Sequence, residues 1–238
     1  MLEASVIIPT YNGEKTILKL YQDISKVLKK NKISFEIIFI DDSSKDNSFK
    51  IINSICKKDK KVKGILLSKN YGQHNAIYCG IQNSNGKYII TMDDDLQHPS
   101  YEIPKVLKFL KSGYDVVYAV PKIHKHNFLR NFFSKLTKKI ISIMMQNNQA
   151  KNINSFRFFK SELVKQFKNI NNSQINIDSL LFWSTSNFAS IKVDHRERKL
   201  GKSGYTFFKL MTHTLNLITS FSSLPLKIAT IIGLFISL

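Results

Sequence analysis

The sequence predicts an α/β protein whose mostly parallel sheet is flanked by helices. Between residues 5 and 120, short apolar runs rich in β-formers alternate with segments of helical period. Polar clusters directly follow four of these runs, at 9–12, 41–44, 68–73 and 93–97. Because ligands bind beyond the carboxyl ends of strands in such sheets, we expect the four clusters to form one site.

The expected elements follow one another in regular order. The first strand is expected at Ser5–Ile8, where Pro9 ends it, and the first helix at Lys15–Lys30, where apolar residues recur at helical spacing. The next strands are expected at Glu36–Ile40, Val62–Leu67, Tyr88–Met92 and Asp115–Val120, and the next helices at Asn47–Lys57, Gln73–Gln82 and Tyr101–Lys111.

The alternation weakens after residue 120. Helices are expected at Asn127–Met145, Glu162–Phe167, Ile177–Thr185 and Thr206–Phe221, strands at Asn154–Phe159 and Ala189–Val193, and a basic turn at Asp194–Gly204. We predict a catalytic domain at 1–204 and a separate region of membrane-interface helices at 205–238.

The apolar run at the C-terminus favours contact with a membrane. Leu226–Leu238 has 13 residues and one charge, Lys227, whereas a spanning helix needs about 20 apolar residues. It is interpreted as an interfacial helix or the start of a transmembrane segment, with an ordinary core helix as the alternative. The mixture of apolar and basic residues in Thr206–Phe221 suits a membrane interface.

Composition restricts the class of partner and the compartment. Lys and Arg number 36 against 17 Asp and Glu, a net charge of +19, which favours an anionic partner, with a solvated Lys-rich surface without such a partner as the alternative. We expect an anionic membrane surface and no nucleic acid, because no helix-turn-helix, zinc-finger or RNP signature is present. The spacing of Cys56 and Cys79 matches neither a zinc site nor a disulfide framework, which favours a reducing compartment.

The strongest chemical signal is Asp93-Asp94-Asp95-Leu96-Gln97 at the end of an expected strand. Three adjacent carboxylates repel one another unless a cation neutralises them. Asp93 and Asp95 point the same way because the side-chain period of a strand is two, and Gln97 continues the alternation. Such oxygen ligands suit Mg²⁺ or Mn²⁺. The alternative is a solvated acidic turn that caps a helix.

Two weaker signals follow earlier strands. The Asp42 carboxylate can accept hydrogen bonds from a nucleobase N–H or from ribose hydroxyls. The alternative for this cluster is capping of the following helix. Tyr11, in Pro9-Thr10-Tyr11-Asn12, can stack on a nucleobase.

In combination these motifs resemble the inverting family 2 glycosyltransferases, and within them the polyprenyl-phosphate glycosyltransferase branch. That branch includes dolichol-phosphate mannose synthases and bacterial undecaprenyl-phosphate glucosyl and aminoarabinosyl transferases. The motifs that carry the resemblance are Ser-Val-Ile-Ile-Pro-Thr-Tyr-Asn at 5–12, Ile-Asp-Asp-Ser-Ser at 40–44, Asn-Tyr-Gly-Gln-His at 70–74, Asp-Asp-Asp-Leu-Gln-His-Pro at 93–99, Glu-Ile-Pro at 102–104 and Arg-Lys-Leu-Gly-Lys-Ser at 198–203.

The resemblance implies a GT-A, Rossmann-like fold, a nucleotide-sugar donor and a divalent metal, Mg²⁺ or Mn²⁺. It assigns the donor nucleotide to Pro9, Tyr11, Asn12, Asp42 and Arg198, the metal to Asp93, Asp95 and Gln97, the catalytic centre to Asp93, Asp94 and Asp95, the acceptor phosphate to Arg130 and Ser134, and the sugar pocket to Gln73 and Arg157. The chain departs from many relatives at 121–125, where it has Lys and His in place of further arginines, and at Ser203-Gly204-Tyr205, where many have Ser-Lys-Tyr.

A phosphate acceptor simplifies the expected mechanism. A phosphate monoester is already an anion near neutral pH, so positioning suffices and no strong base is needed. A hydroxyl acceptor would require a base, for which Asp94, Asp95 or, more weakly, His98 would be the candidates. We expect His74 and His98 to be structural or positional rather than catalytic.

The sequence therefore predicts a metal-dependent inverting hexosyltransferase of cell-envelope glycan synthesis. It would move a sugar from a nucleotide-diphosphate sugar, with UDP favoured over GDP, to polyprenyl (undecaprenyl) phosphate. The alternative is an enzyme of the same fold that glycosylates a hydroxyl of a cell-surface glycan. The family implies the cytoplasmic face of the bacterial plasma membrane and a homo-oligomer such as a tetramer.

Overall fold

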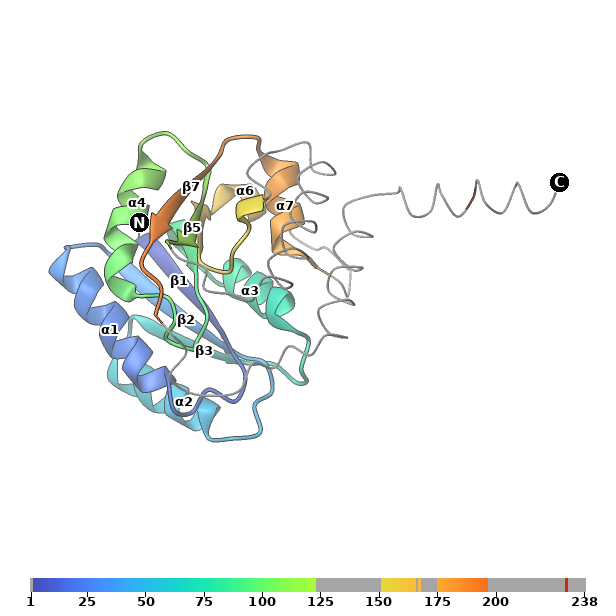
Figure 1. Ribbon diagram of the computed structural model, residues 1–238. Helices are drawn as coiled ribbons and strands as arrows, with labels where there is room; N and C mark the ends of the chain where they lie inside the picture. Colours follow the sequence, from blue (N-terminus) through green and yellow to red (C-terminus); the bar gives the residue numbers. More distant parts are fainter. Residues whose placement is uncertain (1, 123–150, 166, 168–174, 197–229, 231–238) are drawn as a thin grey trace, which may run out of the picture. The chain divides into compact units, whose positions relative to one another are not determined.

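The computed structural model describes residues 2–122, 151–165, 167, 175–196 and 230. These residues build one seven-stranded sheet (Figure 1). Its strands are β1 (Leu2–Thr10), β2 (Phe35–Asp41), β3 (Val62–Leu66), β4 (Gly86–Thr91), β5 (Val116–Pro121), β6 (Arg157–Lys160) and β7 (Phe188–Val193). The order across the sheet is β3-β2-β1-β4-β6-β5-β7, and β6 alone runs antiparallel to its neighbours.

Helices cover both faces of the sheet (Figure 1). On one face lie α1 (Ile17–Lys30), α2 (Ser48–Lys58) and α4 (Ile103–Lys111), which share one hydrophobic core with the strands. On the other face lie α3 (Gln73–Gln82), α6 (Glu162–Lys165) and α7 (Ile177–Ser184), which share a second core. The sheet is thus the middle layer of three.

Burial on both faces explains why the central strands are continuously apolar. Every residue of β2 is buried, and along β1 the side chains of Val6 and Ile8 enter one core while Ile7 enters the other. This alternation follows the period of two in a strand. Parallel strands covered by helices on both sides read as unbroken apolar runs for the same reason.

The expected elements that fall on the described residues are found, with small shifts at their ends. A 3₁₀ turn at Ser100–Glu102 precedes α4, whereas the sequence predicted one helix from Tyr101. Pro104 explains the boundary, because proline lacks an N–H and fits only the first turn of a helix. The strand expected from Asn154 begins at Arg157. The helices expected at Asn127–Met145 and Thr206–Phe221 lie outside the described residues.

The described sheet and its helices belong to one compact unit, Met1–His124 with Ile153–Leu200, and the remaining residues form a second unit. The division into 1–204 and 205–238 stays a prediction. Within the part of the chain that the structure describes, no helix is long and apolar enough to cross a bilayer.

Candidate active site

The loops that follow β1 and β2 are tied together by hydrogen bonds. The backbone N–H of Asn12 donates to Ser44 Oγ (2.9 Å), and the N–H of Lys45 donates to Asn12 Oδ1 (2.8 Å). The N–H of Gly13 donates to Ser48 Oγ (2.8 Å). Asn12 has a φ of 56°, a left-handed conformation that asparagine tolerates better than most residues. Asn12, which was predicted to bind the donor nucleotide, therefore links the loops after β1 and β2 at this edge of the sheet.

Two tyrosines stand exposed above this edge. Pro9 is buried in β1, whereas the Tyr11 side chain two residues later is 47% exposed. Tyr71, in the loop after β3, is 45% exposed, and Lys69 Nζ lies 5.1 Å from the centre of its ring. Tyr71 was not among the predicted site residues, although an aromatic residue in the polar cluster that follows a strand, within Asn-Tyr-Gly-Gln, was a usable signal.

Asp42 is buried and holds the loop after β3. Its Oδ1 accepts the backbone N–H of Tyr71 (2.7 Å), and its Oδ2 accepts that of Gly72 (2.8 Å). Gly72 has a φ of 88°, a conformation that favours glycine, and α3 begins at the next residue. Asp42 thus shapes the loop that carries Tyr71 and starts α3, and its contact with a nucleotide stays a prediction.

Asp93 is held from two sides. Gln73, the first residue of α3, donates from Nε2 to Asp93 Oδ1 (2.6 Å). Ser155, two residues before β6, donates from Oγ to Asp93 Oδ2 (2.7 Å). The structure therefore brings the predicted residues Gln73 and Asp93 together, and it adds Ser155, which the sequence did not indicate.

Asp95 and Gln97 lie in a tight turn that contacts a second segment. The N–H of Gln97 donates to Asp95 Oδ1 (3.0 Å), and Leu96 between them has a φ of 63°. The backbone N–H of Arg196 donates to the carbonyl oxygen of Gln97 (3.0 Å). The basic turn after β7 therefore reaches the predicted metal ligands through Arg196, a residue absent from the predicted set.

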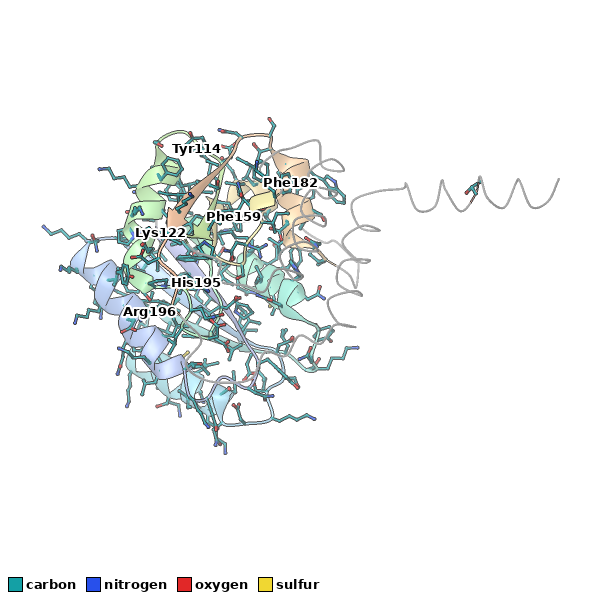
Figure 2. All side chains as sticks on the ribbon, in the orientation of Figure 1. Tyr114, Lys122, Phe159, Phe182, His195 and Arg196 are labelled. Carbon is teal, nitrogen blue, oxygen red and sulfur yellow. The ribbon has the colours of Figure 1, made fainter. Side chains whose placement is uncertain are left out.

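An ion pair holds the start of this basic turn. Lys122 Nζ lies 2.6 Å from Asp194 Oδ1. Figure 2 labels the side chains of Lys122, His195 and Arg196. Lys122 follows β5, and His195 and Arg196 belong to the 194–196 turn that contacts the Asp93–Gln97 loop.

Asp94 has the most perturbed carboxylate of the motif. Burial, followed by repulsion from Asp93 and Asp95, raises its pKa to about 7. Its Oδ2 has no hydrogen-bond partner among the described residues, and a Cβ atom at position 13 would lie only 2.4 Å from that oxygen. Gly13 is therefore needed to admit the carboxyl group.

These oxygens fit a divalent cation shared with a substrate. Burial and the charges of two neighbouring carboxylates disfavour ionisation of Asp94, and a bound cation would relieve this repulsion. No three Asp, Glu, His or Cys side chains among the described residues form a complete metal site. Mg²⁺ commonly uses one or two protein carboxylates and completes its shell with substrate phosphates and water. The assignment of Asp93, Asp95 and Gln97 to such a cation stays a prediction.

The two histidines of the motifs make structural contacts. Nδ1 of His98 accepts the backbone N–H of Asp93 (3.3 Å), and its ring stacks on Phe156 with centroids 4.9 Å apart. Burial lowers the pKa of His98 below its usual value. Nδ1 of His74 accepts the backbone N–H of Ile177 (3.2 Å), which joins α3 to α7.

Arg157 lies in a buried ion pair. Its Nη1 donates to Asp178 Oδ1 (2.8 Å), and both side chains are 4% exposed. The hydroxyl of Tyr118 donates to the same oxygen (2.9 Å), and burial beside Asp178 raises the pKa of Tyr118 well above its usual value. What the structure shows of Arg157 is this link between β6 and α7, and its predicted place in a sugar pocket stays a prediction. Arg130, Ser134 and Arg198 lie outside the described residues.

Comparison with known proteins identifies the family. The model of "Glycosyl transferase family 2" matches residues 5–169. The undecaprenyl-phosphate 4-deoxy-4-formamido-L-arabinose transferase of Serratia proteamaculans is 31% identical over 241 residues, which cover 99% of this chain and 73% of that protein.

Solved structures agree on the fold. Residues 1–349 of TarS from S. aureus superpose with a TM-score of 0.59 at 18% identity, over 82% of this chain and 59% of that one, which is less than two thirds of its length. Glucosyl-3-phosphoglycerate synthase from Mycobacterium tuberculosis, solved with Mn²⁺, UDP and phosphoglyceric acid, gives 0.62 at 16% identity over 90% and 75%. The predicted α/β fold with a mostly parallel sheet is confirmed, and the chain belongs to glycosyl transferase family 2.

Proposed function

We propose that this chain transfers a sugar from a nucleotide-diphosphate sugar to undecaprenyl phosphate. The observation that carries the proposal is the gathering of strand-end carboxylates, Asp42 and Asp93 to Asp95, at one edge of the sheet in a family 2 chain. The similarity to the Serratia transferase, which extends over 99% of this chain, supports the lipid phosphate as acceptor.

The donor would bind across the loops after β1, β2, β3 and β4, with Pro9, Tyr11, Asn12 and Asp42 at the nucleotide. A Mg²⁺ or Mn²⁺ ion, when bound, supplies positive charge that stabilises the leaving diphosphate. Asp93, Asp95 and Gln97 would hold that ion, which fits the unbalanced charge at this site. The exposed ring of Tyr11 offers a stacking surface for the base. Arg198 is proposed to contact the donor phosphates.

The acceptor phosphate would attack the anomeric carbon from the face opposite the leaving group. A phosphate oxygen forms the new bond, the bond to the nucleotide diphosphate breaks, and the configuration inverts. Because the attacking group is already an anion, the protein needs only to position it. Arg130 and Ser134 are proposed to hold this phosphate.

The basic charge and the apolar C-terminus support action at a membrane. A net charge of +19 favours an anionic lipid surface, and we propose the cytoplasmic face of the bacterial plasma membrane. Residues 205–238 would form the interfacial region, and a homo-oligomer such as a tetramer is proposed from the family.

The sugar itself is open to direct test. The name of the Serratia relative specifies a pentose derivative, 4-deoxy-4-formamido-L-arabinose, and the sequence alone favoured a hexose. Transfer to undecaprenyl phosphate in detergent should therefore be measured with UDP-linked forms of that pentose and of hexoses, and with GDP-mannose, in Mn²⁺ or in EDTA.

We expect a lipid-phosphate sugar that forms in Mn²⁺, is lost in EDTA and is lost in Asp95→Ala. Product from a UDP donor only would establish the nucleotide, and the productive sugar would identify the substrate. Nucleotide-sugar hydrolysis without lipid product would overturn the acceptor. Transfer to a glycan hydroxyl would support the same-fold alternative instead.

A further inference from the structure

The pairing of β4 with β6 brings Ser155 opposite Asp93. The two strands are antiparallel, with Ile90 opposite Phe158 and Thr91 opposite Arg157. Extending this register by two residues past the end of β4 sets position 93 against position 155. The Ser155 hydroxyl lies 2.7 Å from Asp93 Oδ2, in agreement with this extended register.

The position of Ser155 is set by the sheet. Thr91 Oγ1 donates to the Ser155 carbonyl oxygen (2.7 Å), and the N–H of Ala119 in β5 donates to the carbonyl oxygen of Phe156 (2.9 Å). The segment before β6 is therefore attached to both neighbouring strands. Hydrogen bonds from rigid elements hold a functional side chain more accurately than bonds from a free loop.

The hydroxyl hydrogen is directed at Asp93. A serine has one O–H to donate, and the other nearby acceptor, Asn154 Oδ1, is 3.4 Å from Oγ against 2.7 Å for Asp93 Oδ2. Gln73 Nε2 holds the opposite oxygen, Oδ1, at 2.6 Å. Both oxygens of Asp93 are thus oriented by neutral donors, which restrict rotation of the carboxylate without cancelling its negative charge.

We propose that Ser155, together with Gln73, is a positioning residue that orients the Asp93 carboxylate toward the divalent cation of the nucleotide-sugar site. The inference rests on the proposed function, since it requires that Asp93 bind a metal. The proposal gives Gln73 a role in orienting Asp93, in addition to its predicted place in the sugar pocket. Loss of a partner that orients a metal ligand typically lowers metal affinity about 10- to 100-fold.

The test measures Mn²⁺ binding to the full chain in the presence of UDP. The electron paramagnetic resonance signal of free Mn²⁺ reports how much of the ion is bound. We expect Ser155→Ala to weaken Mn²⁺ binding about tenfold and Ser155→Thr, which keeps the hydroxyl, to remain within about threefold of the wild type. Gln73→Ala should weaken binding in the same direction. Ser161→Ala, at the residue that follows β6, serves as the matched control and should match the wild type.

Thermal unfolding of each variant separates positioning from damage to the fold. Ser155→Ala with an unchanged melting temperature and weaker Mn²⁺ binding would support the proposal. Mn²⁺ binding to Ser155→Ala equal to that of the wild type would overturn it, and so would failure of Ser155→Thr to restore binding at an unchanged melting temperature. If the wild-type chain itself bound no Mn²⁺ in the presence of UDP, the proposed metal-dependent function would be overturned, and with it the role of Ser155.

Discussion

At the scale of single residues, the site depends on close approach between loops that are distant in sequence. Gly13 shows the point most clearly, because the space that a side chain would occupy there is filled by the Asp94 carboxyl group. Asp42 shows it too, since both of its oxygens accept backbone N–H groups from Tyr71 and Gly72. The motifs of this family thus support one another's geometry as well as any ligand.

Gly13→Ala is expected to damage the donor site. Its Cβ would lie 2.4 Å from Asp94 Oδ2 and 3.1 Å from Thr10 Cγ2, so the buried carboxyl or the loop must move. Such overpacking costs about 1–3 kcal/mol of unfolding free energy, and we also expect weaker binding of UDP with Mn²⁺. Urea denaturation and nucleotide titration check the two effects. Lys15→Ala, an exposed neighbour, is the control, and wild-type behaviour of Gly13→Ala would contradict the close contact.

At the scale of elements, a buried ion pair joins β6 to α7. Arg157 and Asp178 lie in the core on the α3 side of the sheet, and Tyr118 of β5 adds a hydrogen bond to the same carboxylate oxygen. Figure 2 labels Phe159 of β6 and Phe182 of α7, which belong to this layer. The antiparallel strand β6, which Ser155 precedes, is therefore held against α7 by an ion pair as well as by apolar packing.

Removal of both partners should cost less than the sum of the two single removals, because each single removal leaves a buried charge unpaired. Asp178→Ala leaves a buried guanidinium unpaired, and we expect a loss of about 3–5 kcal/mol in unfolding free energy. The double variant Arg157→Met/Asp178→Ala should lose less unfolding free energy than the sum of the losses in Arg157→Met and Asp178→Ala. Urea denaturation of the wild type, the two single variants and the double variant measures this difference. Additive losses would mean that the pair does not couple the two elements.

Prediction from sequence succeeded where the determinants are local. The bounds of α3, Gln73–Gln82, were predicted because its helical period begins directly after Asn-Tyr-Gly. The reversed direction of β6 and the bond between Ser155 and Asp93 could not be predicted, because strand pairing depends on contacts between segments 60 or more residues apart. The pairing of Arg157 with Asp178, 21 residues apart, also depends on tertiary packing of β6 against α7, so the arginine was assigned only through family resemblance.

At the scale of the whole molecule, one buried carboxylate connects four adjacent segments of the sheet. Glu36 of β2 is 3% exposed and accepts hydrogen bonds from Ser5 Oγ of β1 (2.7 Å) and from the N–H of Asn85 before β4 (2.5 Å). Lys63 Nζ of β3 lies 2.7 Å from its other oxygen. The stability of the described sheet should therefore depend on the ionisation of this single group.

The sign of this pH dependence follows from the pKa of Glu36. Burial pushes the pKa upward, but the bonds from Lys63, Asn85 and Ser5 outweigh burial and leave the pKa below its usual value of 4.5. A carboxyl group whose pKa is lower in the folded state adds stability that is fully present above the unfolded pKa and is lost as pH falls through the folded pKa. Glu36→Gln should therefore unfold more easily than the wild type at pH 7, by about 1–3 kcal/mol for the lost charged hydrogen bonds. The difference should shrink as pH falls below the unfolded pKa of about 4.3, because the unfolded carboxyl group then takes up a proton that the folded carboxylate, with its lowered pKa, still resists.

Urea denaturation of both proteins at pH 7 and pH 3.5 measures this difference directly. Glu162→Gln, at the exposed start of α6, should change unfolding little at either pH and so isolates the effect of burial. If the difference in unfolding free energy between Glu36→Gln and the wild type stayed constant down to pH 3.5, Glu36 would connect the four segments through the shape of its side chain rather than through its charge. A gap that closes on acidification would identify Glu36 as a group through which acid weakens the sheet that positions Asp42 and Asp93.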